Sequence, residues 1–264
     1  MYRVLAASIK NFNPLVLIPS FNTGEILRGT VEGALERGFP VWVVVDGSTD
    51  GSDDTLPEPR EGYEVLRLET NSGKGSAVLH GLRQALELGF THVLTMDADG
   101  QHPAGRIADF MEMGRRHPEA LVLGRPVFDA SAPALRVNGR KVSNFWADLE
   151  TLGWGIDDSL FGMRLYPARE LCEVMEETRY ARRFDFDPEV AVRLAWRGVP
   201  IVNLPTPVIY PSAEEGGVSQ FRYLRDNALL TWMHARLMLG FFLRLPRLAT
   251  RGGNPLDHES LRDD

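Results

Sequence analysis

The chain has 264 residues and a formal net charge of −7, from 36 acidic and 29 basic side chains. Hydrophobic residues make up 44% and charged residues 25%, a balance that excludes a disordered chain, a fibre or a polytopic membrane protein. An acidic chain is also poorly suited to tracking a nucleic-acid backbone, so we expect no nucleic-acid partner.

Short apolar runs alternate with helical patterns over the first 125 residues. Continuous Val, Ile and Leu runs are typical of strands that are buried on both faces. Alternation of such strands with helices at this spacing predicts parallel βαβ units in one α/β sheet. We expect strands at 15–18, 41–45, 63–68, 93–96 and 120–124, and helices at 24–37, at 76–88 and through Phe110 and Met111.

The rest of the chain has a weaker pattern. Residues 126–183 are less regular, and a second βα-like passage follows at 184–210. We expect one domain over residues 1–225 and a helical appendage at 226–251. Residues 252–264 are polar and acidic, which predicts a frayed tail.

Polar, glycine-rich segments follow four of the predicted strands. In open α/β sheets ligands bind outside the carboxyl ends of the strands, so these loops should converge on one cleft. Ordinary connections explain the glycines and serines, but they do not explain repeated carboxylates at strand ends. The segments are NTGE (22–25), DGSTDGS (46–52), NSGKG (71–75) and DADGQH (97–102).

Two carboxylates, Asp97 and Asp99, directly follow the strand at 93–96. Residues i and i+2 of an extended segment point the same way, so both carboxylates can face one point. Close carboxylates repel one another unless a proton or a cation intervenes. Mg²⁺ or Mn²⁺ prefers such oxygen ligands, and Gln101 can add an amide oxygen. The alternative is a surface turn in which one Asp caps a helix.

The segment NSGKG precedes a predicted helix. Glycines let a ligand approach the backbone, a helix N-terminus offers free N–H groups to an anion, and Lys74 adds a positive charge. The spacing is not that of a Walker A loop, and a solvated lysine at a helix start is the alternative. Asp46 ends the second strand, where it can bind a base or ribose or simply form the DGS turn.

Six motifs occur in a characteristic order: IPSFN, VVDGSTDGS, NSGKG, MDADGQHP, DDSLFGMRLYP and FDFDPEVAVRLAWRG. Over about residues 13–225 the chain resembles the family-2 glycosyltransferases of the GT-A fold, particularly the dolichyl- or polyprenyl-phosphate sugar transferases. The resemblance implies a Rossmann-like, mixed, mostly parallel sheet flanked by helices. It also implies inverting hexosyl transfer from a nucleoside-diphosphate-sugar of UDP or GDP type.

The resemblance also implies roles for individual residues. Arg125 matches a basic position after the fifth strand, and Gly162 and Arg164 match a step beside the donor sugar in which Met163 replaces an aromatic residue. The donor nucleotide would contact Pro19, Asn22, Asp46, Lys74 and Asp97, and a divalent metal would be held by Asp97, Asp99 and Gln101.

The position of the catalytic base is ambiguous. Counted back from Arg193, Asp187 matches one branch of the family and Glu189 matches the polyprenyl-phosphate branch. Since Pro188 favours a helix start, one of these acids can instead be an N-terminal helix acid. A hydroxyl acceptor needs a carboxylate base, whereas a phosphate acceptor needs positive groups. Candidates for those groups are Arg136, Arg140, Lys141 and Arg222.

Three features depart from the family pattern. Val45 replaces the first acid of the usual DDGS, which weakens the prediction of base recognition. Gln220, in GGVSQF, stands where a basic residue often binds the acceptor phosphate. The QxxRW motif of processive synthases is absent from the sequence, which argues against polymerisation.

The segment 227–248 combines a dense apolar surface with arginines. Trp232, Phe241 and Phe242 suit a helix lying in a membrane interface, which needs an apolar face, cations and aromatic residues. His234 and Arg236 argue against a helix that spans the bilayer. The alternative is a terminal helix packed on the domain or on a second subunit.

The N-terminus lacks the pattern of a secretory signal, and Cys172 is the single cysteine, so no intrachain disulfide is expected. We therefore expect a cytoplasmic enzyme, peripheral on the inner face of the cell membrane, with a lipid-linked or phosphate-bearing acceptor such as polyprenyl phosphate. The alternatives are a sugar-1-phosphate nucleotidyltransferase and a non-catalytic protein that binds nucleotide-sugars.

Overall fold

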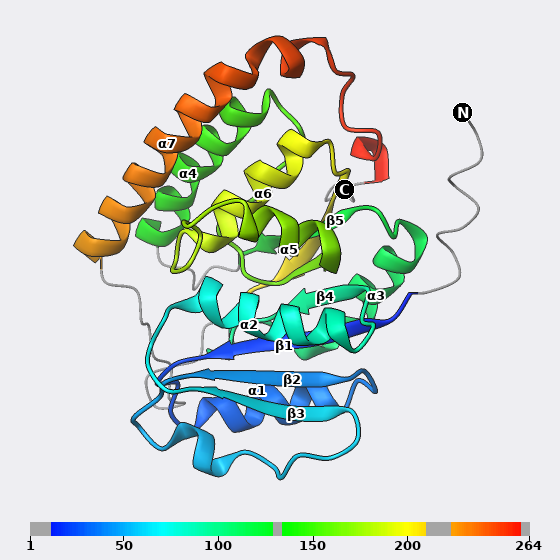
Figure 1. The fold of residues 1–264 in the computed structure, drawn as a ribbon, viewed down its shortest axis with the longest axis vertical. Coiled ribbons are helices and arrows are strands. Elements are labelled where there is room, and N and C mark those ends of the chain that lie inside the picture. Colours follow the sequence, from blue (N-terminus) through cyan, green and yellow to red (C-terminus); the bar gives the residue numbers. More distant parts are fainter. Residues whose placement is uncertain (1–11, 129–133, 210–222, 260–264) are drawn as a thin grey trace.

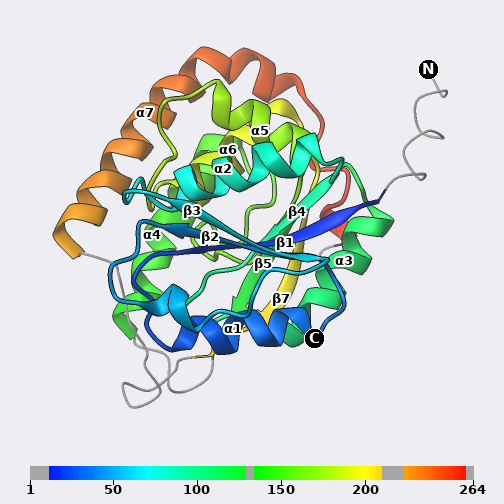
Figure 2. The same ribbon diagram turned by 60° about the horizontal axis from the view of Figure 1, so that its bottom comes forward.

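The computed structural model describes residues 12–128, 134–209 and 223–259. A seven-stranded sheet lies between two layers of helices (Figures 1 and 2). The strands are β1 (Pro14–Ser20), β2 (Val41–Asp46), β3 (Tyr63–Leu68), β4 (His92–Thr95), β5 (Leu121–Val127), β6 (Arg164–Pro167) and β7 (Ile201–Pro207). The α-helices are α1 (Ile26–Leu35), α2 (Lys74–Glu87), α3 (Ile107–Arg116), α4 (Ala134–Thr151), α5 (Ala168–Glu176), α6 (Phe186–Arg197) and α7 (Tyr223–Thr250).

The strands lie in the order β3-β2-β1-β4-β6-β5-β7, and β6 alone runs antiparallel to its neighbours. The predicted mixed, mostly parallel sheet is therefore confirmed. Because β6 is reversed, its first residue pairs with the last residue of β4, as Arg164 lies opposite Thr95. The start of β6 thus reaches the edge at which the parallel strands end, on the left in Figure 1.

The core has two halves, one on each face of the sheet. Along β1, Leu15 and Leu17 belong to the half packed against α2, α5 and α6, whereas Val16 and Ile18 belong to the half packed against α1 and α3. This alternation follows from the two-residue period of a strand. Figure 2 shows both helical layers with the sheet between them.

The structure confirms the predicted strands and helices of the first 125 residues, with ends that shift by a few residues. The prediction of an irregular stretch at 126–183 is wrong, because α4, β6 and α5 lie there. The expected βα order at 184–210 is also wrong, since helix α6 precedes strand β7. Cys172, the single cysteine, is buried.

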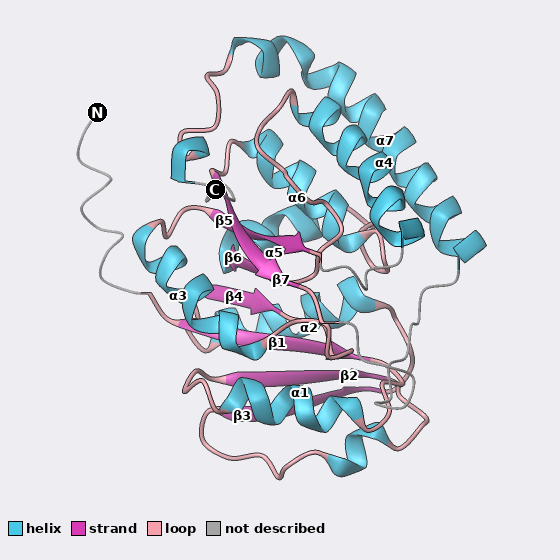
Figure 3. Cartoon of the chain, turned by 180° about the vertical axis from the view of Figure 1, so that it is seen from behind, coloured by secondary structure: helices cyan, strands magenta, loops and turns pink. Residues whose placement is uncertain are grey.

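Helix α7 lies beside α4 (Figures 1 and 3) and also contacts α6. His234 of α7 binds Glu150 and Ser143 of α4 through its two ring nitrogens, at 3.0 and 3.1 Å. The predicted boundary between the domain and its helical appendage, at residues 225 and 226, falls inside α7. The tail was expected to be frayed, but its described part, residues 252–259, is held to the domain. Asn254 exchanges two hydrogen bonds with the backbone of Ile201.

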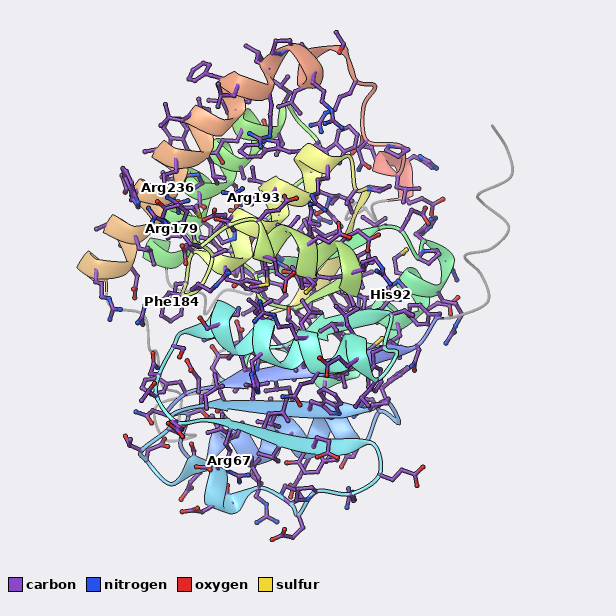
Figure 4. The ribbon with its side chains drawn as sticks, viewed as in Figure 1. Arg67, His92, Arg179, Phe184, Arg193 and Arg236 are labelled. Atoms are coloured by element: carbon purple, nitrogen blue, oxygen red, sulfur yellow. The ribbon has the colours of Figure 1, made fainter. Side chains whose placement is uncertain are left out.

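His92, labelled in Figure 4, begins β4 and is buried. Its ring nitrogens contact the Pro118 carbonyl at 2.8 Å and the Thr91 hydroxyl at 2.9 Å. Burial lowers the pKa of His92 below its ordinary value of 6.5. The unfolded chain therefore binds a proton more readily than the folded chain does, so the contribution of His92 to stability is full above about pH 6.5 and falls as the pH drops.

We predict that His92→Gln reduces this loss of stability in acid. The advantage of the wild type over His92→Gln in free energy of unfolding should shrink between about pH 7.5 and about pH 5.5. Urea denaturation of both proteins at several pH values measures this difference. An advantage that stays constant or grows as the pH falls would contradict the assignment.

Candidate active site

The ammonium of Lys74 lies between two carboxylates at the carboxyl edge of the sheet. Its Nζ atom is 2.6 Å from Oδ1 of Asp97 and 2.6 Å from Oδ2 of Asp187. Lys74 begins α2, Asp97 lies in the loop after β4, and Asp187 lies in the first turn of α6. Three segments far apart in the sequence thus meet at one cation.

Burial and charge act in opposite directions on these three groups. Burial lowers the pKa of Lys74, but the charges of Asp187 and Asp97 outweigh it and raise the pKa above its ordinary value. Burial raises the pKa of Asp97, but Lys74 holds it below its usual range. Burial also raises the pKa of Asp187, and Lys74 offsets this only in part. Lys74 therefore stays charged, and Asp187 is the better proton acceptor of the two carboxylates.

Gly162 leaves room for the Asp97 carboxylate. A Cβ atom added to Gly162 would lie 2.3 Å from Asp97 Oδ2, which is far inside van der Waals contact. The Thr95 hydroxyl donates to the Gly162 carbonyl at 2.9 Å and fixes this approach. Glycine at this position thus permits the close passage of the segment before β6 and the loop after β4.

Arg164 is completely buried behind the site. Its guanidinium donates to the backbone carbonyls of Phe161, Asp158 and Asp187. The residue predicted to lie beside the donor sugar therefore holds the backbone on which Asp187 sits.

Asp99 and Gln101 lie in the same loop as Asp97. Asp99 Oδ1 accepts a hydrogen bond from the Gln101 backbone N–H at 3.1 Å. Burial, with the charge of Asp97 beside it, raises the pKa of Asp99 to about 6. Asp97 and Asp99 place two carboxylates in this loop, and carboxylate and amide oxygens are the ligands that a hard divalent cation prefers. The residues present therefore fit such a cation.

His102 supports this loop and was missed as a site residue by the sequence analysis. Its Nδ1 accepts the backbone N–H of Asp97 at 3.0 Å, and burial lowers the pKa of His102 to about 4. His102 is therefore neutral near pH 7, with its remaining ring proton on Nε2. Its place in the segment DADGQH was the available signal.

Within the described ranges, no three His, Cys, Asp or Glu residues gather to ligate a metal.

Asp46 clamps the NSGKG loop. Its two carboxylate oxygens accept the backbone N–H groups of Ser72 and Gly73, each at 2.7 Å. In the neighbouring loops Asn22 accepts from Thr49 N–H at 2.8 Å, and Pro19 is buried in β1. Asp46 and Asn22 therefore hold loops at this edge, and Pro19 lies in the strand that leads to it.

The remaining predicted residues that the structure describes pair with other groups or are exposed. The Glu189 carboxylate is buried against Arg193 and Arg236. Arg140 pairs with Asp158 at 2.7 Å, and Arg125 lies 3.7 Å from Asp157. Lys141 is exposed on α4. Arg222 and Gln220, and the side chain of Arg136, lie outside the described residues.

The chain belongs to family 2 of the glycosyltransferases, because the model of the family described as "Glycosyl transferase family 2" matches residues 15–167. It is 29% identical over 209 residues to the undecaprenyl-phosphate mannosyltransferase of Micrococcus luteus, covering 72% of this chain and 81% of that protein. It is 27% identical over 249 residues to glycosyltransferase AglJ of Haloferax volcanii, covering 91% of this chain and 73% of that protein.

Two solved structures are similar in fold. S. aureus TarS 1–349 in complex with UDP has a TM-score of 0.56 and 20% identity, over 86% of this chain and 65% of that chain, so the match spans less than two thirds of the TarS chain. Mannosyl-3-phosphoglycerate synthase from Rubrobacter xylanophilus has a TM-score of 0.58 and 17% identity, over 91% and 76%. These likenesses support the fold alone, and they confirm the predicted GT-A fold.

We predict that Gly162→Ala displaces the Asp97 carboxylate and lowers the rate of sugar transfer by about a hundredfold, because a small misplacement of a reacting group is costly. Gly29→Ala is the matched control, since an added Cβ there meets no atom within 4 Å and alanine favours the helix. Transfer assays and thermal unfolding of both variants provide the measurement. A Gly162→Ala protein that folds and keeps the wild-type rate would contradict the geometry.

Proposed function

We propose that this protein transfers a hexosyl group from a nucleoside-diphosphate-sugar to a lipid-linked phosphate acceptor of the polyprenyl-phosphate class. The observation that carries the proposal is the Lys74 ammonium between Asp97 and Asp187 at the carboxyl edge of the sheet. Two relatives, the M. luteus undecaprenyl-phosphate mannosyltransferase and the mycobacterial polyprenol monophosphomannose synthase, support the choice of acceptor.

The donor diphosphate would lie against the start of α2. The free N–H groups of a helix N-terminus and the Lys74 ammonium both favour an anion there. As the sugar leaves, negative charge grows on the diphosphate, and these fixed positive groups stabilise that charge. Lys74 therefore acts on the leaving group, and Asp97 and Asp187 keep it charged and in place.

A divalent cation, Mg²⁺ or Mn²⁺, would be held by Asp97, Asp99 and Gln101. When bound, it would neutralise charge on the donor diphosphate. The raised pKa of Asp99 supports this, since a cation removes the cost of ionising a carboxyl beside Asp97.

The transfer would invert the anomeric configuration. An acceptor oxygen attacks the anomeric carbon, the bond from that carbon to the diphosphate oxygen breaks, and the nucleoside diphosphate leaves with the bonding electrons. Asp187 Oδ1 is buried and has no hydrogen-bond partner among the described residues, so it can accept a polar hydrogen of the substrate. A phosphate acceptor is already an anion and needs no base.

The acceptor would reach the site from a membrane. The described helix Arg225–Thr250 is long and apolar enough to span a membrane by length and composition. Its His234 and Arg236, however, bind buried acids of the domain, which favours a helix that lies along the surface. Apolar side chains are exposed along α4, just after it at Leu152, and along α7, and we refer to them together as the apolar face: Val142, Phe145, Leu149, Leu152, Trp232, Leu239, Phe242, Leu243 and Leu245.

Cations accompany this apolar face. Lys141, Arg225, Arg244 and Arg247 are exposed on the same two helices. An interfacial helix with an apolar face and such cations binds anionic lipid surfaces. We therefore propose that the protein lies on the inner, anionic face of the cell membrane.

The reaction is tested by incubating the protein with a panel of UDP- and GDP-sugars, polyprenyl phosphate and Mg²⁺ or Mn²⁺, and by analysing the lipid by mass spectrometry. We predict that Asp99→Asn folds, because it removes the repulsion between Asp99 and Asp97, and that it lowers transfer by about a hundredfold or more. A chelator should have a comparable effect on the wild type.

Each other outcome has a distinct meaning. Full activity of Asp99→Asn would remove the metal assignment. Release of pyrophosphate would indicate a nucleotidyltransferase, and donor binding without turnover would indicate a non-catalytic binding protein. Glycosylation of a free hydroxyl with no use of polyprenyl phosphate would contradict the acceptor class.

The membrane contact is tested by co-sedimentation with vesicles containing about 30% anionic phospholipid. We predict that the triple variant Trp232→Ser, Phe242→Ser, Leu243→Ser binds these vesicles at least about tenfold more weakly, because three apolar side chains no longer enter the lipid. Leu88→Ser is the matched control, since Leu88 is 69% exposed but lies at the end of α2. Equal binding by the triple variant and the wild type would exclude this face.

A further inference from the structure

A buried ionic cluster joins α7 to the first turn of α6. The Arg236 guanidinium donates to both oxygens of Glu189, from Nη1 at 3.1 Å and from Nη2 at 2.9 Å. Glu189 is completely buried, and Arg193 donates to the same carboxylate at 2.9 Å. Figure 4 shows Arg236 and Arg193 close together. A planar fork that meets both carboxylate oxygens fixes orientation as well as distance.

This cluster lies on both sides of Asp187 in the sequence. Glu189 follows Asp187 by two residues, and Asp185, the N-cap of α6, precedes it by two. Arg236 Nη2 lies 3.9 Å from Asp185 Oδ2. The Asp185 carboxylate in turn accepts the backbone N–H groups of Ala181 and Arg183. Arg236 therefore holds the helical turn that carries Asp187.

Arg236 also contacts the loop behind Lys74. Its guanidinium carbon lies 3.5 Å from the centre of the Tyr180 ring, a cation–π contact. The Arg182 carbonyl in the same loop accepts the backbone N–H of Ser76 at 3.1 Å. The packing is tight, since a Cβ added to Gly73 would lie 2.4 Å from that carbonyl oxygen. One side chain of α7 thus contacts the supports of both Lys74 and Asp187.

We propose that Arg236 is a positioning residue for sugar transfer, which sets the Lys74–Asp187 pair by holding the first turn of α6 and the loop at 180–183. The role in catalysis rests on the proposed function, whereas the effect on the Lys74–Asp187 pair does not. Without Arg236 the first turn of α6 loses its bidentate partner and can rotate away from Lys74.

The kinetic test compares Arg236→Met and Arg236→Lys with the wild type. Arg236→Met should lower kcat by about ten- to a hundredfold, because the reacting groups are misplaced, and leave the KM for the nucleotide-sugar within about twofold. Arg236→Lys should recover part of the rate, since a lysine keeps the charge but not the fork. Arg197→Met is the control, because Arg197 forms ion pairs with Glu173 and Glu177 at the far end of the same helix α6. It should keep the wild-type kcat.

A second readout needs no activity. The chain contains three lysines, so the side-chain ammonium signal of Lys74 can be assigned by NMR with labelled lysine. In the wild type the ammonium protons of Lys74 should exchange slowly with water, because two carboxylates hold them. In Arg236→Met this protection should be lost or the Nζ resonance should shift, while in Arg197→Met it should remain.

The double variant Glu189→Gln, Arg236→Met guards against misfolding, because it removes both buried charges of the bidentate pair together. Arg193 loses its carboxylate partner in this variant, but its side chain is 22% exposed and can reach water. It should fold, transfer sugar slowly and show the altered Lys74 signal. The proposal is overturned if either Arg236 variant folds with a wild-type kcat and an unchanged Lys74 signal. It is also overturned if both Arg236→Met and the double variant fail to fold, because the role is then purely structural. If the wild type transfers no sugar, the proposed function fails, and the Lys74 signal still tests the positioning.

Discussion

The candidate site depends on one shared cation. Lys74 contacts the half-buried carboxylate of Asp97 and the buried carboxylate of Asp187 at the same edge of the sheet. Without this ammonium the two acids would repel one another in a medium of low dielectric constant, and both would tend to take up protons. A charged lysine fixed in this way meets two needs. It keeps the first turn of α6 against the loop after β4, and it places a positive charge where a diphosphate would leave.

The reversed strand β6 explains how these groups come together. Parallel strands bring only their carboxyl ends to this edge, whereas β6 brings its amino end there. Gly162, just before β6, leaves space for Asp97, and the buried Arg164 binds the backbone of Asp187. Arg164 thus supports the backbone that carries Asp187, and its place beside a donor sugar, which the family resemblance implies, stays a prediction.

Helix α7 has two faces with different consequences. Its inward side binds buried acids of the domain, His234 with Glu150 and Arg236 with Glu189. Together with α4, the helix also exposes apolar side chains and cations. A helix that binds lipid on one side and holds the turn of Asp187 on the other would keep the site at a fixed depth relative to the membrane. Burial of the inward charges makes a lasting departure from the domain costly.

The sequence by itself determined the α/β sheet, since buried strands and amphipathic helices leave periodic patterns, and it determined which loops carry the polar groups, since these follow the apolar runs directly. It left Asp187 and Glu189 unresolved, because each acid, counted back from Arg193, matches a different branch of the family. Only the tertiary structure separated them, by placing Lys74 beside Asp187 and Arg236 beside Glu189. It also assigned α4, β6 and α5 to a stretch with weak periodicity, and it gave Asp46 and His102 their partners. Contacts between residues so distant in the chain depend on how elements pack, and local periodicity carries no record of that.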